Sequence, residues 1–250
     1  MQNVLLISDN EYLIGAFRLL TKDLTNASFA YAFSKNNKAL TAKYETKKWI
    51  VPLDVKEKLP ALIEKYDLII SLHCKQIFPS ELVKGVRCIN VHPGLNPFNR
   101  GWYPQVFSIL NGMPCGATIH EIDEGLDHGN IICQKEVALE AWDTSYTIYQ
   151  KVLAAEIALM EENLQKIMDG EYQAFRAEEG NLNLKKDFEK LLEIDLGDTD
   201  TFQNHIDKLR ALSHGNYDNA FFYDRNGTKV YVKITLKKEE VDHHSQISPE

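Results

Sequence analysis

The sequence has no hydrophobic run long enough to span a bilayer. Its longest apolar runs, such as residues 4–7 and 68–70, are far shorter than the ~20 residues that a membrane helix needs. The first residues also lack the basic segment and the small-residue cleavage site of a signal peptide. We therefore expect a protein without a membrane partner.

Positive charge is scarce as well. The chain has 28 Lys and Arg against 36 Asp and Glu, a net charge of −8, and both the first 176 residues and the remainder are acidic. Binding to DNA or bulk RNA through phosphates needs an excess of basic residues. The composition thus argues against a nucleic acid partner.

Cysteine is rare and unclustered. None of the four cysteines belongs to a CxxC or similar motif, which argues against a zinc site and a disulfide framework; they are Cys74, Cys88, Cys115 and Cys133. We interpret them as buried, reduced thiols of a cytoplasmic protein. The pair His243-His244 lies in a polar tail and is interpreted as a solvated chain end, so no metal is expected.

The dinucleotide-binding motif GxGxxG is absent after the first apolar run, which disfavours NAD and FAD. What the sequence does contain is a set of short apolar runs at residues 4–8, 68–72 and 86–91, typical of strands buried on both faces. Helical patterns at residues 12–20 and 56–65 alternate with them. This alternation predicts an α/β fold with a mostly parallel sheet flanked by helices.

The middle of the chain continues the pattern. We expect a helix over residues 101–111 and strands over 116–122 and 131–139. The longest helical pattern covers residues 144–169, with Gly170 placed where a helix-ending glycine belongs.

After Arg176 the composition changes, and Glu178-Glu179-Gly180-Asn181 is interpreted as a boundary loop. We therefore predict a catalytic domain over residues 1–176 and a small C-terminal subdomain over residues 177–250. The elements predicted for this subdomain are a helix over 202–212 and a β-hairpin whose strands cover 220–224 and 229–236.

Two polar residues stand out on an otherwise apolar strand. Asn90 and His92 are separated by one residue, so their side chains leave the strand on the same face. Pro93-Gly94 then ends the strand, and the carboxyl ends of strands in open α/β sheets are where ligands bind. A hydrogen-bonded core pair is the alternative interpretation, because buried polar groups need partners in any case.

Asp127 lies in a turn between Gly125 and Gly129, two residues that permit tight backbone geometry. A carboxylate there can orient a histidine and stabilise its charged form. Simple capping of the turn is the alternative.

Together these residues resemble a known family. Asn-x-His-Pro-Gly at 90–94, followed by Asp-x-Gly-x-Ile-Ile at 127–132, is similar to the folate-dependent formyltransferases over roughly residues 1–176. The resemblance implies a Rossmann-like catalytic domain that uses N10-formyltetrahydrofolate. It implies that Asn90 and a protonated His92 stabilise an oxyanion, that His92 is also the candidate base, and that Asp127 orients His92.

Other segments resemble the sugar N-formyltransferase branch of this family, namely residues 73–79, 95–105 with Asn-Arg-Gly-Trp-Tyr-Pro, and 209–215. This branch implies a nucleotide-linked amino-dideoxy sugar as substrate, with dTDP-4-amino-4,6-dideoxyglucose expected and a 3-amino isomer as the alternative. It also implies a homodimer and a role in O-antigen, that is lipopolysaccharide, synthesis. Methionyl-tRNA, glycinamide ribonucleotide and a non-catalytic binding module remain alternatives.

The binding residues follow from position and resemblance. Lys75 and Arg100 are the candidate cations for the nucleotide diphosphate, although both could be ordinary surface cations. Trp102 and Tyr103 are candidates for the sugar pocket, with plain packing as the alternative. The candidate folate contacts are Phe78, Gly125, Leu126 and His128. His120 is interpreted as a structural histidine.

Overall fold

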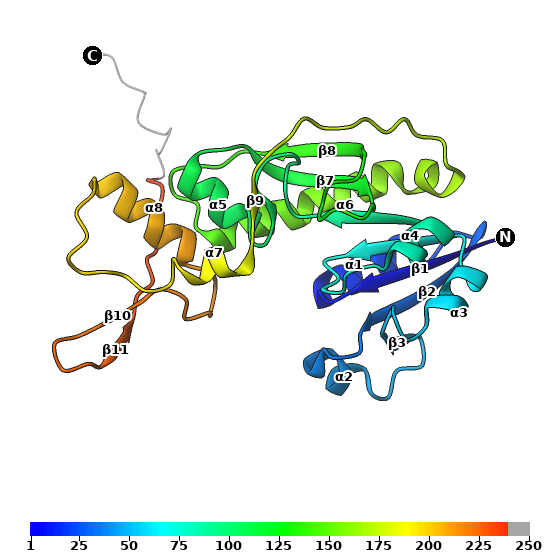
Figure 1. Ribbon diagram of the computed structural model, residues 1–250, viewed down its shortest axis with the longest axis horizontal. Helices are drawn as coiled ribbons and strands as arrows, with labels where there is room; N and C mark the ends of the chain where they lie inside the picture. Colours follow the sequence, from blue (N-terminus) through cyan, green and yellow to red (C-terminus); the bar gives the residue numbers. More distant parts are fainter. Residues whose placement is uncertain (240–250) are drawn as a thin grey trace, which may run out of the picture.

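The computed structural model describes residues 1–239, so the pair His243-His244 lies outside the described residues. Its centre is a seven-stranded sheet with the order β3-β2-β1-β4-β5-β7-β8 (Figure 1). The neighbouring strands from β3 to β5 pair in parallel, whereas β7 is antiparallel to both of its neighbours, β5 and β8. This arrangement confirms the predicted mostly parallel α/β sheet. The strands of the sheet are β1 Gln2–Ser8, β2 Ala27–Ser34, β3 Ile50–Leu53, β4 Leu68–Leu72, β5 Arg87–His92, β7 Cys115–Glu121 and β8 Ile131–Val137.

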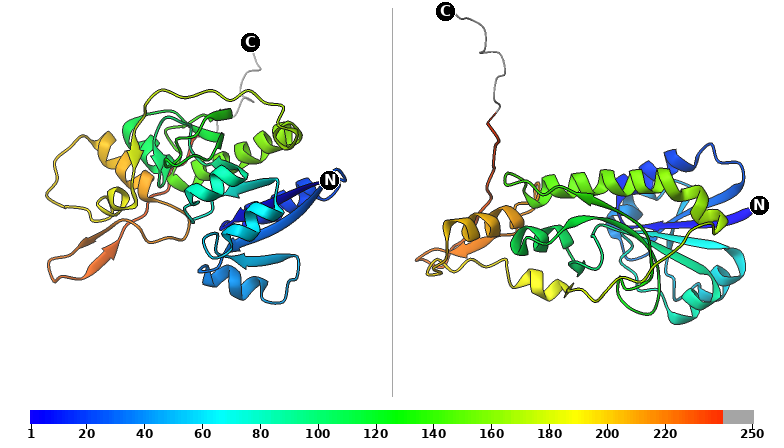
Figure 2. Two further views of the ribbon diagram at one scale, coloured as in Figure 1. Left: turned by 45° about the vertical axis from the view of Figure 1, so that its right-hand side comes forward. Right: turned by 90° about the horizontal axis from the view of Figure 1, so that it is seen from above.

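Eight helices accompany the sheet in the described part of the chain, and most cover its two faces (Figure 2). Their bounds are α1 Glu11–Thr21, α2 Lys38–Tyr44, α3 Leu59–Lys65, α4 Ser80–Gly85, α5 Pro104–Asn111, α6 Ser145–Asp169, α7 Lys185–Glu189 and α8 Phe202–Leu212.

β1 is apolar from Val4 to Ile7 because this part of the strand is buried on both faces. Val4 and Leu6 belong to the core that includes α1, α5 and α6, whereas Leu5 and Ile7 belong to the core on the other face, with α3 and α4. Side chains alternate between the faces of a strand, so a strand covered on both faces needs apolar residues at every position.

Side chains cap the starts of α1 and α6, and a glycine ends α6. The Asn10 side chain accepts a hydrogen bond from the Leu13 N–H (3.1 Å) at the start of α1. Thr144 caps α6 through the N–H of Thr147, and Gly170 ends it with a φ of 72°. These caps confirm the predicted starts of both helices and the predicted end of α6.

Two predicted helices begin later than the sequence pattern suggests. The helix predicted from residue 101 begins at Pro104, because Gly101 (φ 90°) and Tyr103 (φ 53°) have left-handed backbone. The helix predicted from residue 56 begins at Leu59, because Asp54 accepts hydrogen bonds from the N–H groups of Lys56 and Glu57 and holds a turn there.

A further strand pair joins two segments that are far apart in the sequence. β6 (Arg100–Gly101) lies parallel to β9 (Leu182–Asn183). The N–H of Arg100 donates to the Asn181 carbonyl (3.1 Å), and the N–H of Trp102 donates to the Asn183 carbonyl (2.9 Å). We call residues 176–183 the strap, because they run across the loop that contains β6.

The C-terminal part contains the predicted helix and a hairpin at the predicted place, although the second strand of the hairpin ends at Tyr231 and not at residue 236. α8 is followed by β10 (Phe221–Tyr223) and β11 (Lys229–Tyr231), an antiparallel pair that projects from the body of the molecule (Figure 1). Arg210 of α8 is buried and donates to the carbonyls of Glu140 (3.1 Å) and Asp143 (2.9 Å), just before α6. The division of the chain at residue 176 stays a prediction.

No helix within residues 1–239 combines the length and the hydrophobicity needed to cross a membrane.

Candidate active site

The structure brings Asn90, His92 and Asp127 together at the carboxyl end of β5. Asn90 Nδ2 donates to Asp127 Oδ1 (3.2 Å), and His92 Nδ1 lies 3.5 Å from Asp127 Oδ2. The His92 residue is 3% exposed, so the cluster is largely shielded from water. A carboxylate in contact with both an imidazole and an amide, shielded from water, can take part in moving a proton and stabilising a negative charge.

The local sequence explains how β5 presents its two polar side chains. Ile89 and Val91 point into the core that includes α6, so Asn90 and His92 must leave the opposite face. The spacing of two that the sequence displays is therefore what places both groups in one site.

Asp127 reaches the site from the loop between β7 and β8. Its backbone has a φ of 47°, a conformation that non-glycine residues rarely adopt. Two hydrogen bonds hold it there: Gly101 N–H to Asp127 Oδ2 (3.1 Å) and Asn96 Nδ2 to the Asp127 carbonyl (3.0 Å). Strained backbone held by its surroundings is common at functional sites.

The electrostatics favour a neutral imidazole beside an ionised carboxylate. Burial lowers the pKa of His92 to about 4, although Asp127 acts in the opposite direction. Burial alone would raise the pKa of Asp127, but the neighbouring His92 and the hydrogen bond from the Gly101 N–H keep it below its usual value. His92 Nε2 is buried without a hydrogen-bond partner, so at neutral pH it offers a free lone pair.

His120 joins this cluster, whereas the sequence predicts only a structural role for it. Its side chain is 2% exposed, and its Nε2 lies 3.2 Å from Asn90 Nδ2 and 3.6 Å from Asp127 Oδ1. In the sheet, His120 of β7 stands directly opposite Asn90 of β5. The pairing register of β5 with β7 is what places His120 in the site. The spacing of residues along the chain does not reveal this register.

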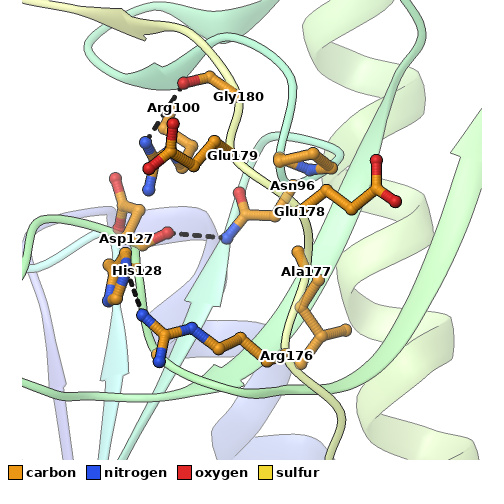
Figure 3. A pocket seen from close by; sticks show the side chains of 12 residues that line it. Asn96, Arg100, Asp127, His128, Arg176, Ala177, Glu178, Glu179 and Gly180 are labelled. Carbon is orange, nitrogen blue, oxygen red and sulfur yellow. Dashed lines mark hydrogen bonds between the residues drawn. The ribbon is translucent and has the colours of Figure 1, made fainter.

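A polar cavity of about 340 Å³ borders Asp127 (Figure 3). Arg100 lines it and donates through Nη2 to the Gly180 carbonyl (3.2 Å), while Arg176 Nη2 lies 3.3 Å from His128 Nε2. One wall is made by residues 176–180 of the strap. The sequence predicts a boundary loop over residues 178–181, and its acidic, glycine-containing residues give no signal for a role at the site.

The close approach of the strap depends on one glycine. A Cβ on Gly180 would lie 1.9 Å from the Pro97 carbonyl oxygen, so a larger residue would push the strap outward.

The remaining predicted binding residues do not line this cavity. Lys75 is exposed after β4, and its backbone N–H donates to Asp9 Oδ2 (2.9 Å). Trp102 and Tyr103 lie against each other, and Tyr103 also packs on Phe188, with ring centroids 4.2 Å apart. Phe78 is buried in the core under α3 and α4, and Gly125 and Leu126 are exposed in the loop before Asp127.

A second polar cluster lies at the carboxyl ends of β1 and β4. Asn10 Nδ2 donates to the Tyr149 hydroxyl (2.9 Å), which lies 3.2 Å from His73 Nδ1. His73 Nε2 in turn lies 2.7 Å from Oε1 of the fully buried Glu156. β1 and β4 are neighbours at which the strand order of the sheet reverses, and ligands of open α/β sheets bind at such points.

Within residues 1–239, no three His, Cys, Asp or Glu side chains are grouped so that they could hold a metal ion. The same residues contain no disulfide: Cys88 and Cys115 are buried, and Cys74 and Cys133 are half-buried.

Comparison with known proteins gives two family matches. Residues 2–164 match the family described as formyl transferase. Residues 187–238 match the N-formyltransferase dimerization C-terminal domain.

Individual relatives agree with these matches. A dTDP-4-amino-4,6-dideoxyglucose formyltransferase of Mycobacterium tuberculosis is 52% identical over 188 residues, which cover 75% of this chain and 80% of the relative. The crystal structure of a 4-N formyltransferase from Francisella tularensis is 40% identical, with a TM-score of 0.92 over 95% of this chain and 99% of that one. A formyltransferase from Anoxybacillus kamchatkensis, crystallised with UDP-4,6-dideoxy-4-formamido-L-AltNAc and tetrahydrofolate, is 28% identical, with a TM-score of 0.60 over 84% of this chain and 98% of that one.

Proposed function

Since the chain belongs to the formyl transferase family, we propose that it transfers the formyl group of N10-formyltetrahydrofolate to the amine of a nucleotide-linked amino-dideoxy sugar. The preferred acceptor is dTDP-4-amino-4,6-dideoxyglucose. The observation that carries the proposal is the buried contact among Asn90, His92 and Asp127 in a chain so similar to enzymes of this activity.

N10-formyltetrahydrofolate supplies the formyl group, whose carbon the neutral amine of the sugar attacks. Asn90 donates through its amide to the formyl oxygen as negative charge develops there. His92 accepts the proton that the amine loses, through the free Nε2 that faces no other partner. It then gives this proton to N10 of the folate as the bond between N10 and the formyl carbon breaks and tetrahydrofolate leaves. Asp127 holds Nδ1 of the ring and stabilises the positive charge that His92 acquires.

Two relatives favour a 4-amino sugar, and the charge of the chain disfavours one alternative acceptor. The Mycobacterium tuberculosis relative is named for this acceptor, and the Francisella tularensis structure is a 4-N formyltransferase. The net charge of −8 also opposes binding of methionyl-tRNA, because tRNA is bound through its phosphates.

We assign Lys75, Arg100, Trp102 and Tyr103 to the nucleotide sugar. Lys75 follows β4, next to the point where the strand order reverses, and its exposed ammonium could reach a diphosphate there. Phe78, Gly125, Leu126 and His128 are assigned to the folate. In support, the last three share the short loop that carries Asp127, so a folate bound there would bring its formyl group close to His92.

The test is a panel of dTDP- and UDP-linked 3-amino and 4-amino sugars, each incubated with N10-formyltetrahydrofolate and read by the mass gain of the sugar. Methionyl-tRNA and glycinamide ribonucleotide serve as alternative acceptors in the same panel. We expect the fastest transfer to the 4-amino sugar on dTDP. Tight binding of an amino sugar without turnover of any acceptor would instead identify a non-catalytic binding module.

We further propose that two copies associate through the β10–β11 hairpin. Tyr223 and Tyr231 on this hairpin are each 49% exposed. A lone two-stranded hairpin is marginally stable in water, so a projecting one with exposed aromatic side chains gains from being covered. The match of residues 187–238 to a dimerization domain supports a second copy as the cover.

We infer a cytoplasmic location and a role in supplying a formylated sugar for O-antigen synthesis. Folates and nucleotide sugars are cytoplasmic metabolites, and four cysteines without a disulfide in the described residues suit a reducing compartment.

A further inference from the structure

The orientation of the Asn90 amide depends on a neighbour outside the three proposed catalytic residues. An asparagine can donate through its nitrogen or accept through its oxygen, and the two ends have nearly the same shape. Only the nitrogen end can stabilise negative charge on a formyl oxygen. Some feature of the site must therefore select that end.

The hydrogen bonds of His120 identify the selecting group. His120 Nδ1 lies 2.7 Å from the carbonyl oxygen of Glu121, which can only accept, so Nδ1 must carry the proton. In the neutral ring Nε2 then has a lone pair, and it lies 3.2 Å from Asn90 Nδ2. A register shift between Ile119 and His120 in the pairing of β7 with β8 occurs where this side chain leaves the strand.

Asp127 completes the selection. Its Oδ1 lies 3.2 Å from the same Asn90 nitrogen. Two acceptors therefore face one end of the amide, and a flipped Asn90 would turn its oxygen toward both of them. Burial makes that repulsion costly, because water does not screen it.

We propose that His120 is a positioning residue: it holds one N–H of Asn90 in place so that the second N–H can turn from Asp127 to the formyl oxygen during transfer. The amide has two N–H groups, one for each acceptor in the resting site. If His120 did not retain the first, the amide could rotate when the second changed partner. The inference rests on the proposed formyl transfer and adds a residue that does not touch the reacting atoms.

Two substitutions of similar size separate this role from plain packing. In His120→Asn the new amide can still donate to Glu121 but is too short to accept from Asn90. In His120→Gln the longer side chain can place its oxygen near the position of Nε2. We expect His120→Asn to lower kcat by about 10- to 100-fold with the KM of both substrates changed by less than about 3-fold, and His120→Gln to restore kcat to within about 3-fold of wild type.

A double substitution tests whether the effect passes through Asn90. In an Asn90→Ala background, His120→Asn should lower kcat by no more than about 2-fold further, because there is no amide left to orient. Cys115→Ala is the control, since Cys115 is 2% exposed on the same strand but absent from the site, and it should lower the melting temperature without changing kcat. Wild-type kcat in His120→Asn, failure of His120→Gln to restore activity, or fully multiplicative costs would each overturn the inference.

A second readout is independent of turnover. Long-range ¹H–¹⁵N NMR on the wild-type protein distinguishes the two neutral tautomers of His120, and the inference requires the proton on Nδ1. A proton on Nε2 would refute it even in an active enzyme. Absence of transfer to every amino sugar, with the Nδ1 tautomer present, would instead refute the proposed function.

Discussion

A side chain on Gly94 would occupy the space beside the catalytic nitrogen of His92. A Cβ built at Gly94 would lie 2.5 Å from His92 Nε2, well inside van der Waals contact. The backbone cannot easily yield, because the Gly94 carbonyl accepts a hydrogen bond from the buried Thr118 hydroxyl (2.7 Å). The lack of a side chain at residue 94 thus keeps the proton-accepting side of the ring open.

We expect Gly94→Ala to displace the His92 ring from Asp127 and to lower kcat at least about 10-fold. Gly15→Ala in α1 is the matched control, because nothing lies within 4 Å of its added Cβ, and it should leave kcat unchanged. Steady-state kinetics of both variants, with melting temperatures alongside, check the prediction. Unchanged kcat in a folded Gly94→Ala protein would show that the ring position is not critical.

Substitution of His92 and Asp127 tests the proposed proton transfer. His92→Asn removes the base, so we expect kcat to fall at least about 100-fold while the affinity for the nucleotide sugar is largely retained. Asp127→Asn should lose activity comparably, because an amide cannot stabilise the charged ring. The double variant should cost much less than the product of the two single effects, since the residues act as one unit. A double variant with multiplicative losses would contradict this coupling.

The buried His92 should also make stability depend on pH. Its folded-state pKa of about 4 lies below the ordinary value of 6.5, so between these two pH values the unfolded chain binds a proton that the folded chain does not. The free energy of unfolding should therefore fall as the pH falls through this window, by as much as roughly 3 kcal/mol from this group. Urea unfolding of wild type and His92→Asn at several pH values would measure it, and the variant should show the weaker dependence. Parallel curves would mean that His92 titrates normally.

Lys75 and Arg100 are tested through substrate affinity. Lys75→Ala and Arg100→Ala should raise the KM for the nucleotide sugar about 5- to 50-fold with a smaller change in kcat, because a lost phosphate contact weakens ground state and transition state together. Lys22→Ala is the control: Lys22 follows α1, at the far end of the helix from the carboxyl ends of the strands. If only the KM for the folate rises, the two binding regions have been assigned the wrong way round.

The hairpin prediction concerns assembly. Tyr223→Asp combined with Tyr231→Asp should convert a dimer into a monomer, because burying two carboxylates in an apolar interface is costly. Leu19→Asp, an exposed position on α1 that is 68% accessible, should leave the mass unchanged. Analytical ultracentrifugation across a range of concentrations decides between the outcomes. A wild-type protein that is monomeric at all concentrations would contradict the proposed association through the hairpin.

The sequence predicts best the strands that helices cover on both faces of the sheet. β1, β4 and β5 are covered on both faces, so their apolar runs were recognisable without any knowledge of the tertiary structure. β2 mixes Ser, Ala and aromatic residues, and the edge strand β3 contains Pro52, so neither shows such a run.

The site follows the same logic. The two-residue spacing of Asn90 and His92 on a strand predicts that their side chains share one face, and the glycines around Asp127 predict its tight turn. His120 enters the site through its register opposite Asn90, and the strap enters through pairing of β9 with the distant β6. Both depend on which segments meet in three dimensions, which local patterns along the chain do not encode.

The pairing of β6 with β9 constrains how this chain could be recombined with its relatives. Gly101 of β6 donates to the Asp127 carboxylate, and a Cβ on Gly101 would lie 2.4 Å from the Asn183 carbonyl oxygen of β9. A chimera joined at residue 176 would take its catalytic loop from one parent and the strand beside it from another, and any mismatch would be transmitted to Asp127. A crossover placed after Asn183 keeps both segments from one parent, so the C-terminal part can be exchanged there with the least disturbance of the catalytic carboxylate.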